Sequence, residues 1–124
     1  MSVEAYLNHA MTIPGARGAS IVDYGAGTCL GTTGAAPDDH AAAAAGASEV
    51  MAAVTRTAPF TSATREDAME DLIITSRSGY HLLRRLSTGF DARLVLYLWL
   101  DRDRGNLAVA RRRLRELGAH PARA

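Results

Sequence analysis

The chain has 124 residues, which allows one domain built around a single hydrophobic core. Its formal net charge is only +1, so it lacks the basic excess that is typical of nucleic-acid-binding proteins. Cys29 is the only cysteine, the N-terminus does not read as a signal peptide, and no apolar run approaches the roughly 20 residues that span a bilayer. We therefore expect a soluble cytoplasmic protein without direct membrane insertion.

The first half of the sequence predicts a helix, a hairpin and a second helix. Apolar residues first recur at helical spacing, then alternate in two short segments around a Gly-Ala-Gly turn. Asp38 or Asp39 can cap the alanine-rich segment that follows. In chain order, the predicted elements are a helix over 3–11, strands over 18–24 and 28–34, and a helix over 41–58.

The second half predicts three consecutive strands and a last helix. Short Gly-containing segments, RSG and STG, separate the strands and make them antiparallel neighbours. The predicted elements are a surface loop over 60–68, strands over 69–76, 80–86 and 91–100, and a helix over 106–117. We expect one domain over residues 1–118, followed by a frayed tail over 119–124.

Together these elements predict an α+β fold in the order α-β-β-α-β-β-β-α, with a five-stranded antiparallel sheet and helices on both faces. Residues 93–100 are apolar at nearly every position, which is typical of a central strand covered on both sides. The strand over 69–76 should lie at an edge, where Leu72, Ile73 and Ile74 come with no proline and little charge to discourage pairing. Such an edge favours a homodimer, because pairing of identical edges about a two-fold axis covers both.

The motifs that could carry chemistry are weak. The hairpin glycines have the spacing G-x-G-x-x-x-G and no Lys-Ser or Lys-Thr follows them, so a nucleotide-binding loop is not indicated. The four histidines are far apart in the sequence and do not have the spacing of zinc ligands. No nucleophile, base and orienting group recur at a plausible spacing. We expect no enzymatic activity, no catalytic residue, no metal and no cofactor.

Individual side chains receive ordinary structural interpretations. We expect Cys29 to be a small buried residue, and Tyr97 and Trp99 to share the core face of the central strand. His81 should be a surface or packed imidazole. Asp67, Glu70 and Asp71 form an acidic cluster that we expect to be solvated.

Three segments carry a family resemblance: PGARGASIVDYGAG near the start, EDLIITSRSGYHLLRRL in the meander and LDRDRGNLAVARRRLREL at the end. In order and spacing they resemble the roadblock family, related to a dynein light chain, over roughly residues 3–117. The resemblance implies a roadblock/profilin-like fold and a non-catalytic dimer that binds a Ras-like small GTPase, as scaffold or GTPase-activating protein. The arginine-only, alanine-rich composition resembles the actinobacterial branch, which implies a bacterial signalling module that can include a histidine-kinase-like sensor.

The resemblance also implies where contacts form. The second helix and the third strand would meet their symmetry mates, and a surface built largely from the second helix and adjoining loops would bind the partner. The expected dimer-interface residues are Leu72, Ile73, Ile74, Ala43, Gly46, Ala47 and Val50, and the expected partner-binding residues are Glu49 and Arg56.

Two alternative functions remain open at the level of sequence. One is a nucleic-acid-binding module that uses the arginines of the last helix, although a solvated helix face explains these residues as well. Those arginines are Arg111, Arg112, Arg113 and Arg115. The other is a sensory domain that encloses a small molecule between sheet and helices, which its ligand would stabilise against heat.

Overall fold

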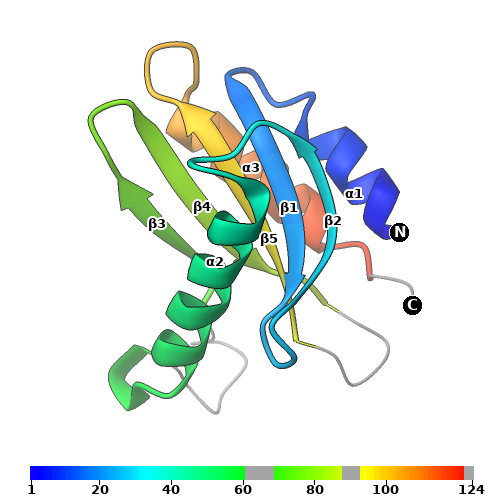
Figure 1. Cartoon of the computed structure of the whole chain (residues 1–124). Helices are drawn as coiled ribbons and strands as arrows, with labels where there is room; N and C mark the ends of the chain where they lie inside the picture. Colours follow the sequence, from blue (N-terminus) through cyan, green and yellow to red (C-terminus); the bar gives the residue numbers. More distant parts are fainter. Residues whose placement is uncertain (61–68, 88–92, 122–124) are drawn as a thin grey trace.

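The computed structural model of the chain describes residues 1–60, 69–87 and 93–121. It shows an α+β fold in which three helices pack on one five-stranded antiparallel sheet, as predicted (Figure 1). In chain order the elements are α1 (Val3–Ala10), β1 (Ala16–Asp23), β2 (Thr28–Gly34), α2 (His40–Thr55), the 3₁₀ turn η1 (Ala58–Phe60), β3 (Asp71–Thr75), β4 (Gly79–Arg85), β5 (Leu94–Asp101) and α3 (Leu107–Gly118).

The strands lie in the order β2-β1-β5-β4-β3. This order confirms that the predicted apolar strand, β5, is central and that β3 lies at an edge. The boundaries differ by a few residues: β3 is shorter than the predicted 69–76, and α2 ends three residues before the predicted end at 58. Most of the predicted loop, and the first two residues of the predicted strand over 91–100, lie outside the described residues.

One face of the sheet is covered by α1 and α3. Fifteen buried residues form the core on this side, among them Leu82 of β4, Leu98 of β5 and Leu114 of α3. The chain ends also meet here, because the Tyr6 hydroxyl donates to the carbonyl of His120. The assignment of residues 119–124 to a frayed tail stays a prediction, and 122–124 lie outside the described residues.

The opposite face is covered by α2 alone. Asp39 caps this helix by accepting a hydrogen bond from the Ala42 amide at 2.7 Å, in agreement with the predicted cap. A smaller buried cluster joins the helix to the sheet: Val22, Ala44, Ala47, Met51, Leu83, Val95 and Tyr97. Because α2 lies nearest to β1 and β2, the strands at the other end of the sheet, β4 and β3, are only partly covered on this face (Figure 1).

The structure corrects two expectations about single residues. Cys29 is exposed and not buried. It lies on the edge strand β2, where α1 packs against Gly31 instead: a Cβ at Gly31 would lie 2.9 Å from Val3 Cγ1 and 3.0 Å from Leu7 Cδ1. A larger residue at position 31 would therefore displace the Val3 and Leu7 side chains of α1, whereas the Cys29 side chain is not covered by the helix.

Asp71, expected in a solvated cluster, is instead an ion-pair residue with only 8% of its side chain exposed. Arg111 Nε of α3 donates to Asp71 Oδ2 at 3.0 Å, and Arg84 Nη1 of β4 lies 3.9 Å from the same oxygen. The hydrogen bond with Asp71, followed by its negative charge, raises the pKa of Arg111. Asp67, another member of the predicted cluster, lies outside the described residues.

Candidate dimerisation groove

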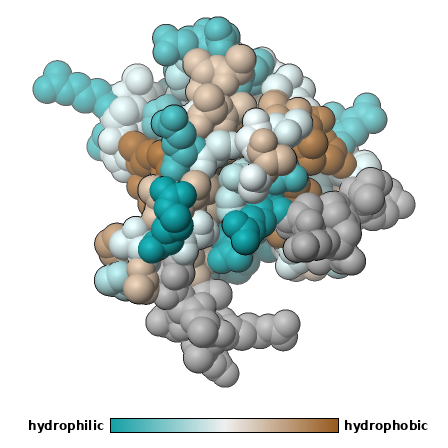
Figure 2. All heavy atoms as spheres, turned by 60° about the horizontal axis from the view of Figure 1, so that its bottom comes forward, coloured by the Kyte–Doolittle hydropathy of each residue, from teal (hydrophilic) through white to brown (hydrophobic). Residues whose placement is uncertain are grey.

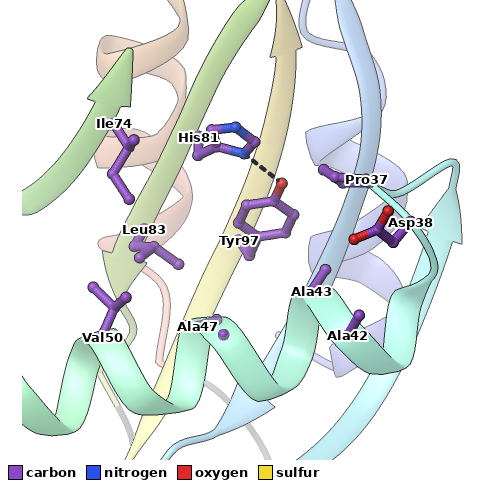
Figure 3. A pocket seen from close by; sticks show the side chains of 11 residues that line it. Pro37, Asp38, Ala42, Ala43, Ala47, Val50, Ile74, His81, Leu83 and Tyr97 are labelled. Atoms are coloured by element: carbon purple, nitrogen blue, oxygen red, sulfur yellow. Dashed lines mark hydrogen bonds between the residues drawn. The ribbon is translucent and has the colours of Figure 1, made fainter. Parts of the chain in front are cut away.

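A groove of about 330 Å³ runs between α2 and the strands that this helix leaves partly covered. One wall is the small-residue side of α2, and the floor is formed by β4 and β5, with β3 beyond them (Figure 3). Its principal lining residues are Ala43, Gly46, Ala47 and Val50 of α2, together with Ile74, His81, Leu83 and Tyr97 of the sheet. Asp38 lies at the end of the groove near the start of α2, in the left-handed region at φ 57°.

The structure brings most of the residues predicted for a dimer interface into this one groove. Ala43, Gly46, Ala47 and Val50 all line it, and so does Ile74 from the edge strand, which is 44% exposed. Their role in a dimer remains a prediction.

The other predicted residues lie elsewhere. Leu72 packs against the α2 side of the core, but Ile73 points to the opposite face and packs against the cluster beneath α1 and α3. Successive strand residues alternate between faces, so the three could not have shared one side-chain surface. Glu49 is exposed on α2, and exposed Arg56 is its C-terminal cap; neither lines the groove.

Gly46 has no evident role within the protomer. A Cβ added at this position would meet nothing within 4 Å. Glycine in a helix interior costs about 1 kcal/mol relative to alanine, because its backbone loses more conformational freedom on folding. The residue leaves a shallow, open strip on α2 that another backbone could approach closely.

His81 and Tyr97 supply the polar atoms on the floor of the groove. His81 Nδ1 lies 2.8 Å from Tyr97 Oη, and the two rings are stacked with centroids 6.0 Å apart (Figure 3). Burial lowers the pKa of His81 and raises the pKa of Tyr97 to about 12. At neutral pH the pair is therefore an uncharged, hydrogen-bonded unit on a mostly apolar surface.

The sequence does not indicate that this pair belongs to a site. It predicts a surface or packed imidazole for His81 and a core position for Tyr97. In register, His81 lies opposite Trp99 and Leu83 lies opposite Tyr97, so the pair is a diagonal one between β4 and β5. The alternation along β5 does place Tyr97 on one face with Trp99, but only the register shows which residue of β4 it meets.

Among the described residues, no strand pairs with β3 on the side that faces away from β4. The Ser76 amide donates to the carbonyl of Gly79 at 2.8 Å, just beyond the ladder. Antiparallel pairs alternate between bonded and non-bonded positions, and the pairing of β3 with β4 runs without a register shift. Ile73 is therefore a non-bonded position, and its N–H and C=O point to the free edge.

Other candidate sites are less developed. The sequence suggests that the four arginines of the last helix lie on a solvated face, but two of them have partners in the structure. Arg111 is held by Asp71, and Arg113 donates to the Thr12 hydroxyl at 2.6 Å. Within residues 1–60, 69–87 and 93–121, no three His, Cys, Asp or Glu side chains are grouped so that they could hold a metal ion.

On the side seen in Figure 2, hydrophobic side chains form separate patches between hydrophilic ones. In the part of the chain that the structure covers, no helix combines the length and hydropathy needed to cross a bilayer.

Comparison with known structures identifies the fold. MglB from Myxococcus xanthus superposes with a TM-score of 0.74 at 17% identity, over 94% of this chain and 82% of that one. An MglB structure described as having a tetrameric arrangement gives 0.72 at 17% identity, with the same coverage. The Roadblock/LC7 domain from Streptomyces avermitilis gives 0.69 at 15% identity, over 96% of this chain and 93% of that one.

No protein-family model matches the chain, and no curated protein matches it by sequence. The structural matches to MglB and to the Roadblock/LC7 domain nevertheless confirm the roadblock resemblance at the level of the fold.

Proposed function

We propose that this chain, which has the Roadblock/LC7 fold, is a non-catalytic homodimer that regulates a Ras-like small GTPase in a bacterial signalling module. The observation that supports the dimer most directly is the groove beside α2, because both Gly46 of α2 and Ile74 of the edge strand β3 line it. The GTPase is proposed from the roadblock resemblance, with which the fold agrees.

A second copy of the chain is the occupant that fits both features. Antiparallel pairing of two β3 edges about a two-fold axis satisfies the outward N–H and C=O of Ile73 in each copy. On the α2 face, the same axis brings the second copy's α2 toward the groove. The small residues there allow two helices to approach closely, and Val50 and Ile74 supply apolar area. The tetrameric arrangement described for one MglB structure is consistent with self-association of this fold.

In such a dimer the outward side of each α2 stays accessible. Glu49 and Arg56 are exposed there, on the middle and at the end of the helix. We propose that they contribute to the surface that binds the GTPase, and that the dimer acts as scaffold or GTPase-activating protein. A histidine-kinase-like sensor is a further proposed partner in the same cytoplasmic module.

The test uses single-turnover GTP hydrolysis by a Ras-like GTPase of the same organism, with and without the purified dimer. Complex formation that depends on the bound nucleotide is the expected result. A stimulated rate would indicate an activating protein, and binding with an unchanged rate would indicate a scaffold. Absence of binding to any Ras-like GTPase of that organism, in either nucleotide state, would contradict the proposal.

A small-molecule sensor is the second candidate, because the groove volume of about 330 Å³ falls within the range of ligand pockets. Its mostly apolar walls and the His81–Tyr97 pair would suit a flat, weakly polar ligand. Thermal stabilisation by such a ligand would favour this function. The open β3 edge, which a small molecule would leave unpaired, favours the dimer instead.

A further inference from the structure

His81 lies where a second copy would cover it. The imidazole is half-buried on the floor of the groove, next to Tyr97 of β5 and opposite Ile74 of β3. The side of α2 that faces the groove contributes only Ala42, Ala43, Gly46, Ala47 and Val50, so it offers no charge or hydrogen-bonding side chain to the ring.

The charged groups around the ring are few. Asp38, in the segment before α2, lines the end of the groove, and among the described residues no carboxylate oxygen lies within 4.0 Å of His81. Arg17 of β1 stacks 3.7 Å above the Trp99 ring, and Trp99 is the cross-strand neighbour of His81. Among the described residues, an imidazolium at this position would thus have no carboxylate partner.

We propose that His81 makes assembly of the dimer pH-dependent, because a second copy seated in the groove would remove the protonated imidazole from water without supplying a counter-charge. The inference rests on the dimer proposed above and adds its regulation. Tyr97 does not itself titrate in this range, since its pKa is about 12.

The direction follows from linkage. Burial already lowers the pKa of His81 in the protomer, and covering the groove would lower it further. The dimer is then most stable above the pKa that His81 has in the separated protomer. It weakens as pH falls below that value, because His81 binds a proton more tightly in the separated protomers than in the dimer. Each dimer contains two such rings, so the dissociation constant rises by up to about a hundredfold per pH unit once the protomers are protonated.

The experiment is sedimentation velocity on a concentration series of the whole chain, at about pH 7.5 and about pH 5.5. We expect the dimer dissociation constant of the unaltered chain to be several-fold higher at the lower pH, and that of His81→Gln, which cannot be protonated, to change less than about twofold. His9→Gln, on α1 and outside the groove, should keep the response of the unaltered chain.

A dimer whose affinity does not change with pH, or a full response in His81→Gln, would overturn this inference and leave the dimer intact. A monomer at both pH values would overturn the dimer and this inference together.

A second readout does not depend on stability in acid: the pKa of His81, followed by its imidazole proton resonances, should be lower by about one unit or more in concentrated than in dilute protein. Equal values at both concentrations would likewise overturn the inference.

Discussion

The guanidinium of Arg111 and the carboxylate of Asp71 join the last helix to the first residue of the edge strand. Arg111 Nε lies 3.0 Å from Asp71 Oδ2, and its Nη2 lies 3.4 Å from Oδ1, so the contact has two hydrogen bonds. Arg84, opposite Asp71 on β4, brings a second positive charge to the same carboxylate. The contact holds the start of β3 against the sheet, directly beside the proposed dimer edge.

Asp71→Asn should destabilise the protomer by about 1–3 kcal/mol, because it leaves Arg84 nearly buried without a counter-charge. The contribution from Arg111 is smaller, since 38% of its side chain is exposed and solvent screens the pair. Urea denaturation measures the loss. Glu70→Gln is the control: the Glu70 side chain is 60% exposed and 3.8 Å from Arg111, and its loss should cost less than about 0.5 kcal/mol. Equal effects of the two substitutions would contradict this account of Asp71.

The hydrophobic pattern was sufficient to predict the layers of the fold. The nearly continuous apolar run of β5 places it at the centre, and the three short strands joined by Gly-containing turns give neighbouring antiparallel pairs. These features depend on local sequence and on burial alone, so they can be read without knowing which residues touch.

Side-chain partners could not be predicted in the same way. Asp71 and Arg111 are 40 residues apart, and nothing in the local sequence of either indicates the other. The exposure of Cys29 likewise depends on where α1 crosses the sheet. The pairing of His81 with Tyr97 required the register of β4 against β5. The α2 residues that line the groove were named because the roadblock resemblance implies that the second helix meets its symmetry mate, and the local sequence alone does not indicate a groove there.

Gly46→Leu should weaken the dimer by at least about tenfold while leaving the protomer folded. The added side chain enters open space in the protomer but fills the strip that the second copy needs. Ala45→Leu is the matched control, because Ala45 is also exposed on α2 but does not line the groove. Dissociation constants from sedimentation equilibrium compare the two. If both variants associate as the unaltered chain does, α2 does not lie in the interface.

Reversing the charges of Glu49 and Arg56 should reduce complex formation with the GTPase, while the dimer persists. Changing Arg112, Arg113 and Arg115 together to glutamine should leave any stimulated hydrolysis within a few-fold, because a true arginine finger would cost roughly 10³ or more in rate. Arg111 is kept in this variant, since its loss would remove the contact with Asp71. Single-turnover hydrolysis measures both variants. Loss of activity in the arginine variant alone would place the functional face on the side of α3.

Exposed residues on the two edge strands allow the central claim to be tested with a matched pair of variants. Ile74 on β3 and Leu30 on β2 are each 44% exposed, so glutamate at either position is tolerated similarly by the protomer. The measurement is sedimentation velocity of the unaltered chain, Ile74→Glu and Leu30→Glu at tens of micromolar. We expect a dimer for the unaltered chain and Leu30→Glu, and a monomer for Ile74→Glu, in which two buried carboxylates would face the interface. An unaltered chain that stays monomeric, or an Ile74→Glu variant that stays dimeric, would contradict a dimer built on β3 and the groove beside α2.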